Sequence, residues 1–145
     1  MDVVALGELL IDFTENGVSG QGNPLFEANP GGAPCNVLAM LSRLGHRTAF
    51  IGKVGNDFFG KQLEQTIIDV GIDASGLQKD DDVHTTLALV HTYPDGDRDF
   101  SFYRNPGADM MLTADEVDLS LVRNAKIFHF GSLSMTDKIC ENATK

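Results

Sequence analysis

The sequence predicts an α/β fold that combines a parallel sheet with a small antiparallel β flap. Strand-like apolar runs alternate with amphipathic helical segments through residue 71, and this alternation is typical of parallel βαβ units. At 85–104 two strand-like runs flank a turn, after which the α/β alternation returns. We therefore expect a layered core with one hairpin standing apart from it.

The first strand–helix unit covers the first 45 residues. The run 3–13 starts as an apolar strand, and 17–32 contains five glycines and two prolines, which predicts a loop. A helix follows, with Pro34 at its first position and Gly45 as its C-terminal cap. The expected apolar face of this helix consists of Val37, Leu38, Leu41 and Leu44.

The second unit and the flap follow. Residues 48–55 are strand-like, and 57–71 is helical with Gly71 as its stop. The turn of the flap is predicted at Pro94–Asp97, where proline sets φ and glycine supplies a positive φ.

The α/β pattern then resumes. Thr113 and Glu116 form a capping box, which predicts one helix over 114–125. A strand at 126–131 and the start of another helix at 134 complete the expected elements.

Composition excludes several classes of function. The 145 residues include 21 acidic and 11 basic ones, a net charge of −10, and no basic stripe, so we expect no nucleic-acid partner. No apolar run approaches the ~18 residues of a membrane span, and the N-terminus resembles a strand rather than a signal peptide. We expect a cytoplasmic protein with no membrane contact, and reduced, metal-free thiols at Cys35 and Cys140.

A glycine-rich entry to the first helix is one candidate binding site. Gly31 and Gly32 permit close backbone approach, the helix N-terminus adds a positive dipole, and the Asn36 amide can bond adjacent hydroxyls. Such a loop suits a polyhydroxyl ligand. The alternative, a plain glycine-rich helix entry with a capping asparagine, has about even weight on spacing alone.

Asp12 and the end of the flap are further candidates. Asp12 follows an apolar run at a strand end, where α/β proteins bind ligands, although a solvated acid is an equal alternative. Phe102 and Arg104 end the flap and could close over a ligand, whereas the alternative is a half-buried strand face with one exposed charge. Asp109 receives no role.

The segment 55–62 only imitates a phosphate-binding loop. It approaches the G-x-x-x-x-G-K-[ST] pattern but has Gln62 where a hydroxyl would hold Mg²⁺. We therefore interpret it as a turn and a helix start. No G-x-G-x-x-G follows a strand, so a dinucleotide site is unsupported.

Several stretches together resemble the PfkB (ribokinase-like) family of carbohydrate kinases, and within it the fructokinases. They are "GELLIDF", "PGGAPCNVLAMLSRLG", "GKVGNDFFGKQL", "FYRNPGADMML" and "KIFHFGSLSM", and the likeness covers essentially all of 1–145. The resemblance implies a three-layer α/β core with a small β lid at about 85–104. It also implies transfer of the γ-phosphoryl group of ATP to a sugar hydroxyl, most simply of fructose, with Mg²⁺.

The resemblance also implies which residues bind the sugar. The matching positions are Asp12, Gly31, Gly32 and Asn36, and the lid adds Phe102 and Arg104. The family's second signature, a glycine-rich stretch with the catalytic aspartate, has no counterpart in this sequence. We therefore expect 1–145 to be the N-terminal part of a longer kinase, without the nucleotide-binding part and inactive by itself.

Alternative functions remain open at this point. One is a kinase of the same family that acts on 2-keto-3-deoxygluconate, another sugar or a nucleoside, because an arginine such as Arg104 can pair with a carboxylate. Another is a non-catalytic module that binds sugar or forms a homodimer through the exposed edges of the lid.

Overall fold

The computed structural model describes residues 1–93 and 95–145, so the Pro94 part of the predicted turn lies outside the described residues. A core sheet has the strand order β5-β4-β1-β8 and all of its pairs are parallel. The strands are β1 (Val3–Leu6), β4 (Thr48–Gly55), β5 (Ile72–Asp80) and β8 (Ile127–Phe130). The predicted parallel α/β core is therefore confirmed.

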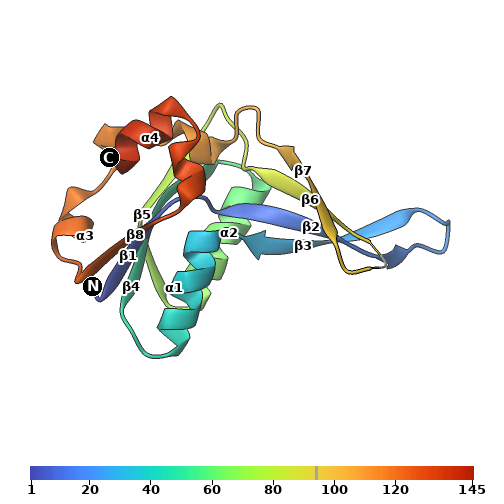
Figure 1. The fold of residues 1–145 in the computed structure, drawn as a ribbon, viewed down its shortest axis with the longest axis horizontal. Helices are drawn as coiled ribbons and strands as arrows, with labels where there is room; N and C mark the ends of the chain where they lie inside the picture. Colours follow the sequence, from blue (N-terminus) through green and yellow to red (C-terminus); the bar gives the residue numbers. More distant parts are fainter. Residues whose placement is uncertain (94) are drawn as a thin grey trace.

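A second sheet forms the lid and extends away from the core (Figure 1). Its order is β3-β2-β6-β7, with β2–β6 parallel and the two outer pairs antiparallel. The strands are β2 (Leu10–Val18), β3 (Pro24–Gly31), β6 (Leu87–Thr92) and β7 (Arg98–Tyr103). The lid thus contains the predicted hairpin and a second hairpin beside it.

Helices cover both faces of the core sheet, which gives three layers (Figure 1). Helices α1 (Ala33–Arg43) and α2 (Phe58–Asp69) pack on Val3, Ala5 and Phe50. The opposite face of the same strands, with Val4, Leu6 and Ile51, packs on the C-terminal elements. The contacts come from α3 (Leu119–Arg123), α4 (Lys138–Thr144) and the residues Leu112 and Val117. Three short helices complete this part of the chain, η1 (Ala108–Met111), η2 (Ala114–Glu116) and η3 (Ser132–Met135).

The glycine-rich segment 17–32 is not the loop that its composition predicts. Half of it is β3, which pairs with β2. The chain leaves the core between β1 and β2, so 3–13 is not a single strand either. Strand β3 lies at the edge of the lid sheet, and an edge strand tolerates prolines because one side of its backbone needs no partner.

Three further predictions need correction. The helix expected over 114–125 is split, because Val117 is extended and the Asp118 side chain starts a new helix by accepting from the Ser120 N–H. Strand β5 was not predicted. On α1, Leu38 is buried but Val37 and Leu44 are exposed, so the expected apolar face is only partly covered.

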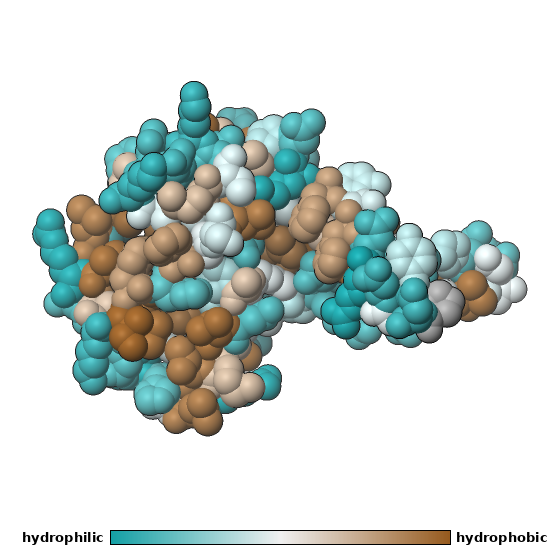
Figure 2. All heavy atoms as spheres, viewed as in Figure 1, coloured by the Kyte–Doolittle hydropathy of each residue, from teal (hydrophilic) through white to brown (hydrophobic). Residues whose placement is uncertain are grey.

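Apolar side chains also remain exposed on β8, the edge strand of the core sheet. Figure 2 shows apolar surface gathered over α1 and β8. The exposed residues there are Val37, Met40, Leu44, Ile127, Phe128 and Phe130. Within residues 1–93 and 95–145, no helix is long and apolar enough to cross a membrane.

Candidate functional site

One face of the lid sheet carries most of the predicted binding residues. Asp12 on β2 is in register with Asn29 on β3 and Ala88 on β6, and Ala88 is in register with Phe102 on β7. Registered partners project to the same face of a sheet, so these four side chains form one row across the four strands. We name this surface the Asp12 face.

The next row of the Asp12 face lies at the base of the lid. Leu10 is in register with Gly31, and residues two apart on a strand share a face, so Gly31 lies below Asp12 and Asn29. A Cβ on Gly31 would overlap the Asp12 carboxylate. Glycine at this position therefore leaves room for the Asp12 side chain over the backbone.

Asp12 is a half-buried carboxylate without a positively charged partner. No hydrogen bond to its side chain occurs within the described part of the chain, and burial raises the pKa of Asp12 above its usual value. A carboxylate oxygen can accept several hydrogen bonds. Asp12 is thus able to accept hydrogen bonds from a ligand that carries two neighbouring hydroxyls.

Gly32 starts helix α1 in a conformation that favours glycine. Its φ is 120°, and a Cβ there would collide with the carbonyl oxygen of Glu8. The buried Glu8 carboxylate accepts a hydrogen bond of 2.9 Å from the Ala33 N–H, which fixes the start of the helix beneath the loop. This role of Glu8 was not predicted from the sequence.

Asn36 lies in the first turn of α1 and its side chain is exposed. It lines a cavity of about 210 Å³ with Pro30 and Gly31, at the side of α1 that faces α2. Gly31 therefore borders both this cavity, which Asn36 lines, and the Asp12 face. The predicted grouping of Asp12, Gly31, Gly32 and Asn36 around the entry to α1 is compatible with this geometry.

Arg104 follows β7 and forms a buried ion pair with Asp109. Its Nε and Nη2 atoms lie 2.8 and 2.7 Å from Asp109 Oδ2. The other oxygen, Oδ1, accepts a 2.5 Å hydrogen bond from the Thr86 hydroxyl. Asp109 is only 4% exposed, so the residue that received no role from its sequence context is the most buried carboxylate at the base of the lid.

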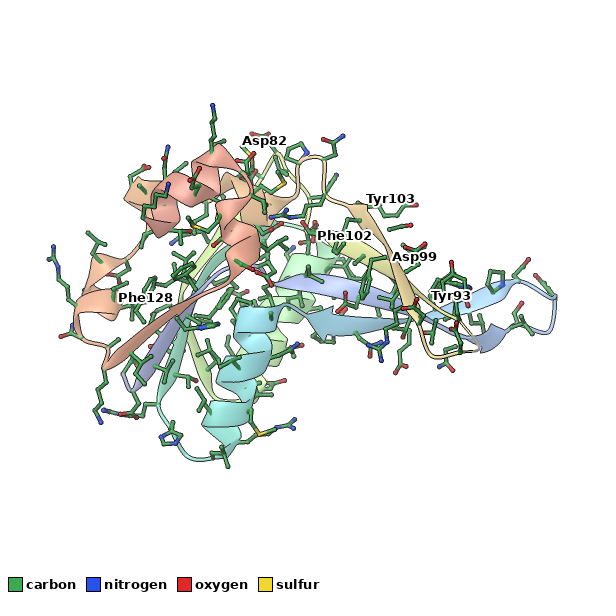
Figure 3. All side chains as sticks on the ribbon, viewed as in Figure 1. Asp82, Tyr93, Asp99, Phe102, Tyr103 and Phe128 are labelled. Atoms are coloured by element: carbon green, nitrogen blue, oxygen red, sulfur yellow. The ribbon has the colours of Figure 1, made fainter. Side chains whose placement is uncertain are left out.

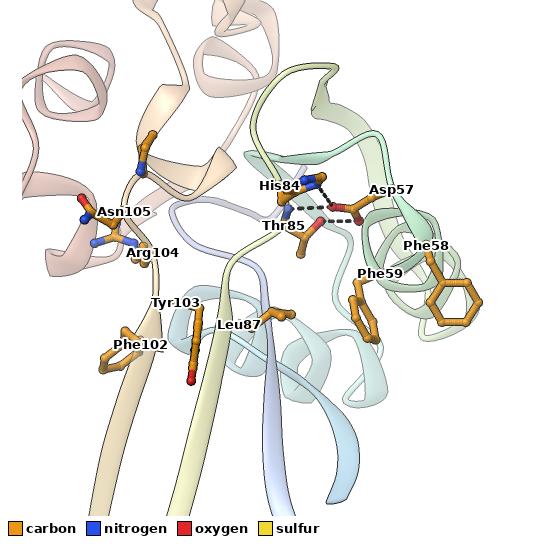
Figure 4. Close-up of a pocket in the computed structure, with 11 residues that line it drawn as sticks. Asp57, Phe58, Phe59, His84, Thr85, Leu87, Phe102, Tyr103, Arg104 and Asn105 are labelled. Carbon is orange, nitrogen blue, oxygen red and sulfur yellow. Dashed lines mark hydrogen bonds and ion pairs between the residues drawn. The ribbon is translucent and has the colours of Figure 1, made fainter.

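A second cavity lies mainly on the opposite side of the lid sheet. It has a volume of about 610 Å³ and is lined by Phe59, Leu87 and Tyr103, and also by the predicted site residues Phe102 and Arg104. Figure 4 shows Tyr103 and Leu87 on the side of Phe59, and Phe102 on the other side of β7. Figure 3 shows Phe102 and Tyr103 near the base of the lid and Tyr93 farther out. Asp12, Gly31 and Asn36 do not line this cavity, so we place the candidate site on the Asp12 face, which borders the cavity at Phe102 and Arg104.

Asp57 closes that cavity near the start of α2. It accepts hydrogen bonds from Thr85 N–H and Oγ1, both 2.8 Å long, and from Gly60 N–H. Burial opposes the charge, but these hydrogen bonds outweigh it and hold the pKa of Asp57 below its usual value. The segment 55–62 is thus a capped helix start, as interpreted from the sequence, rather than a phosphate-binding loop.

The geometry of the Asp12 face suits a neutral polyhydroxyl ligand, because it combines a carboxylate without a cationic partner and an exposed aromatic ring, with the buried glycines Gly31 and Gly32 at its base. The 1–93 and 95–145 segments contain no group of three His, Cys, Asp or Glu residues placed to hold a metal ion.

The whole chain, residues 1–145, matches the sequence profile of the pfkB family carbohydrate kinases. The chain belongs to this family. A fructokinase from Solanum tuberosum is 48% identical over 143 residues, which cover 97% of this chain and 45% of that protein. The chain thus spans less than half the length of the curated relatives it matches.

Solved structures of pfkB-type kinases agree with this fold. The fructokinase of Xylella fastidiosa superimposes with a TM-score of 0.90 at 34% identity, over 98% of this chain and 44% of that one. A candidate ribokinase II of E. coli, solved with ATP and Mg²⁺, gives a TM-score of 0.88 at 28% identity, over 99% of this chain and 46% of that one. The core is therefore part of a ribokinase-like fold.

Proposed function

We propose that this chain is the sugar-binding part of an ATP-dependent fructokinase. The observation that carries the proposal is the row on the Asp12 face, in which Asp12 and Phe102 project to the same side of the lid sheet from strands separated by β6, with Gly31 in the next row on β3. Membership of a carbohydrate kinase family and 48% identity to fructokinases support fructose as the acceptor.

In this proposal each residue has a separate task. Asp12 accepts hydrogen bonds from two sugar hydroxyls, and its lack of a cationic partner keeps both oxygens free. Gly31 and Gly32 let the sugar approach the backbone at the N-terminus of α1, with Asn36 beside them. Phe102 covers an apolar part of the sugar ring and excludes water when the lid closes.

The catalytic step belongs to a further part of the protein in this proposal. Phosphoryl transfer requires a base within hydrogen-bond reach of the attacking hydroxyl and cationic groups around the phosphoryl oxygens. We assign the catalytic aspartate and the sites for ATP and Mg²⁺ to residues C-terminal of this chain. The exposed apolar side chains of β8 and α1 support a further segment that packs against them. The chain alone is then inactive.

Two finer points complete the proposal. The lid forms a homodimer contact, which is supported by the edge position of β7 and the exposed rings of Phe100, Phe102 and Tyr103. The protein acts in the cytoplasm, as expected from the sequence.

The test is ADP release by the full-length protein with fructose, ribose, 2-keto-3-deoxygluconate and a nucleoside as acceptors. We expect the highest kcat/KM with fructose. A higher kcat/KM with another acceptor would retain the kinase and refute the fructose assignment. Sugar binding without ADP release from any acceptor would favour a non-catalytic binding module.

A further inference from the structure

Asp109 connects the two ends of the lid hairpin. Thr86 is the residue before β6 and Arg104 is the residue after β7, and both donate hydrogen bonds to the same carboxylate. The β6–β7 register pairs Leu87 with Tyr103, so Thr86 and Arg104 continue it as the next pair. One side chain from the core thus holds both strands of the hairpin at their base.

The Asp109 carboxylate is itself rigidly placed. It lies in η1, and the Ala108 N–H donates a 2.9 Å hydrogen bond to the His84 carbonyl, which ties η1 to the segment that leads into β6. Gly107 has no room for a side chain, because a Cβ would meet the Thr86 hydroxyl and the Arg104 side chain. Thr86, Arg104 and Gly107 are therefore closely packed around the Asp109 carboxylate.

Arg104 belongs to the Asp12 face. Residues two apart on a strand project to the same face, so Arg104 lies on the side of Phe102, about 7 Å along the chain from the row that contains Asp12. Figure 4 shows Phe102 and Arg104 on the same side of β7. The guanidinium therefore lies next to the surface proposed to hold the sugar.

Asp109 changes what Arg104 can offer to a ligand. Nε and Nη2 are bonded to Asp109, whereas the Nη1 end has no partner among the described residues and is not sealed from solvent. The positive charge of Arg104 is already balanced by a carboxylate that is 4% exposed. A balanced arginine still donates to a hydroxyl, but it attracts a second carboxylate far less than a free arginine does.

We propose that Asp109 is a positioning residue that orients Arg104 on the Asp12 face and, by balancing its charge, sets the acceptor preference toward neutral sugars over sugar acids. This inference rests on the proposed sugar kinase function. It also decides against the view that Arg104 is present to pair with the carboxylate of 2-keto-3-deoxygluconate, because the side edge of its guanidinium is already occupied.

The test compares two variants of the full-length protein, Asp109→Asn and Asp57→Asn. The first substitution retains the shape of the side chain and removes the negative charge, so Arg104 becomes an unbalanced cation. Asp57→Asn is the matched control, because Asp57 accepts hydrogen bonds from Thr85, next to Thr86 at the base of the lid hairpin, but makes no hydrogen bond or ion pair with Arg104. We expect the fructose to 2-keto-3-deoxygluconate ratio of kcat/KM to fall by about tenfold or more in Asp109→Asn and to stay within twofold of wild type in Asp57→Asn.

A double variant shows whether Asp109 acts through Arg104. In an Arg104→Met background the charge is gone, so Asp109→Asn should no longer change the ratio. An unchanged ratio in folded Asp109→Asn, or an equal fall in Asp57→Asn, would overturn the inference.

A separate measurement distinguishes failure of this inference from failure of the proposed kinase function. Calorimetric affinities for the same two sugars without ATP report the preference even if no phosphorylation occurs. A wild-type protein that phosphorylates neither sugar would refute the kinase proposal, and the shift of the affinity ratio in Asp109→Asn would still support or refute the role of Asp109.

Discussion

The two sheets of this protein are built from different kinds of sequence. In the core sheet every residue of β1 and β4 is buried, and both faces are covered by helices. In the lid every residue of β7 is exposed, and the Asp12 face contains a carboxylate, an amide and an aromatic ring in one row. The core sheet thus provides stability, whereas the lid sheet uses marginal packing to keep polar and aromatic groups accessible.

The sharpest way to test this division is the same substitution in both sheets. Phe50→Ala removes a fully buried ring from the core sheet, so we expect it to reduce the free energy of unfolding by about 3–5 kcal/mol. Urea unfolding followed by circular dichroism measures the change. A loss below about 1 kcal/mol would show that the core sheet is not the main source of stability.

The second prediction concerns the carboxylate of the Asp12 face. Asp12→Asn should weaken fructose binding by about 1.5–3 kcal/mol, because charge-assisted hydrogen bonds are lost. The same variant should unfold at a slightly higher temperature at pH 7, since burial raises the pKa of Asp12 and its charge opposes folding. Binding is measured by calorimetry and unfolding by a thermal scan.

Asp99→Asn is the matched control for Asp12. Asp99 lies in the same sheet but pairs with His91 on the opposite face, and it is exposed. Its substitution should leave fructose affinity unchanged. Equal weakening by both variants would contradict the assignment of the sugar to the Asp12 face.

The third prediction uses the ion pairs at the end of β4. Lys53 lies 2.7 Å from Glu116 and 3.2 Å from Asp80. Burial opposes the charge of both carboxylates, but hydrogen bonds, including those from Lys53, outweigh it and hold the pKa of Glu116 and Asp80 below their usual values.

The sign of the pH dependence follows from those lowered pKa values. The two carboxylates stabilise the fold above their unfolded-state pKa, and this stabilisation is lost as pH falls from about 5 to 3. Lys53→Met should therefore be less stable at pH 7 and should lose less stability than wild type on acidification. Urea unfolding at several pH values measures both, and parallel curves for the two proteins would contradict the role of Lys53.

The smallest expected effect completes the comparison. Phe102→Ala removes a ring that is 54% exposed on the lid, so the free energy of unfolding should change by less than about 0.5 kcal/mol. The KM for fructose should nevertheless rise, since the ring covers the sugar in the proposed site. A large decrease in the free energy of unfolding would contradict this expectation, because it would show that packing in the lid contributes substantially to stability.

The sequence correctly predicted the elements in which the apolar periodicity and the capping or turn residues indicate the same helix or strand. Strand 48–55 coincides with β4, and the 57–71 helix is confirmed because Asp57 caps its start and Gly71 has a φ of 86°. The hairpin at 85–104 is also confirmed in β6 and β7. In these segments local propensity and tertiary packing favour the same structure.

Strand β3 and the Asp109 cluster at the base of the lid hairpin were harder to predict, for a physical reason. Strand β3 is stabilised by pairing with β2 and not by its own residues, which include Pro24, Pro30 and several polar side chains. The role of Asp109 depends on contacts with Thr86 and Arg104, which only the folded hairpin brings together. Asp12 was selected for its position after an apolar run, but the expectation that it ends a strand is wrong, because Asp12 lies inside β2 and its side chain is placed on the lid by pairing with β3 and β6.

The two lid hairpins share a modular construction. Each begins at its base with a registered pair, Leu10 with Gly31 and Leu87 with Tyr103. From there each hairpin extends outward as a series of further registered pairs. Removing or adding residues in opposed pairs near the tips changes the length of the lid while the base keeps its register. The reach of the lid over a bound molecule is therefore a quantity that evolution or protein engineering can adjust in steps of two residues, independently of the core.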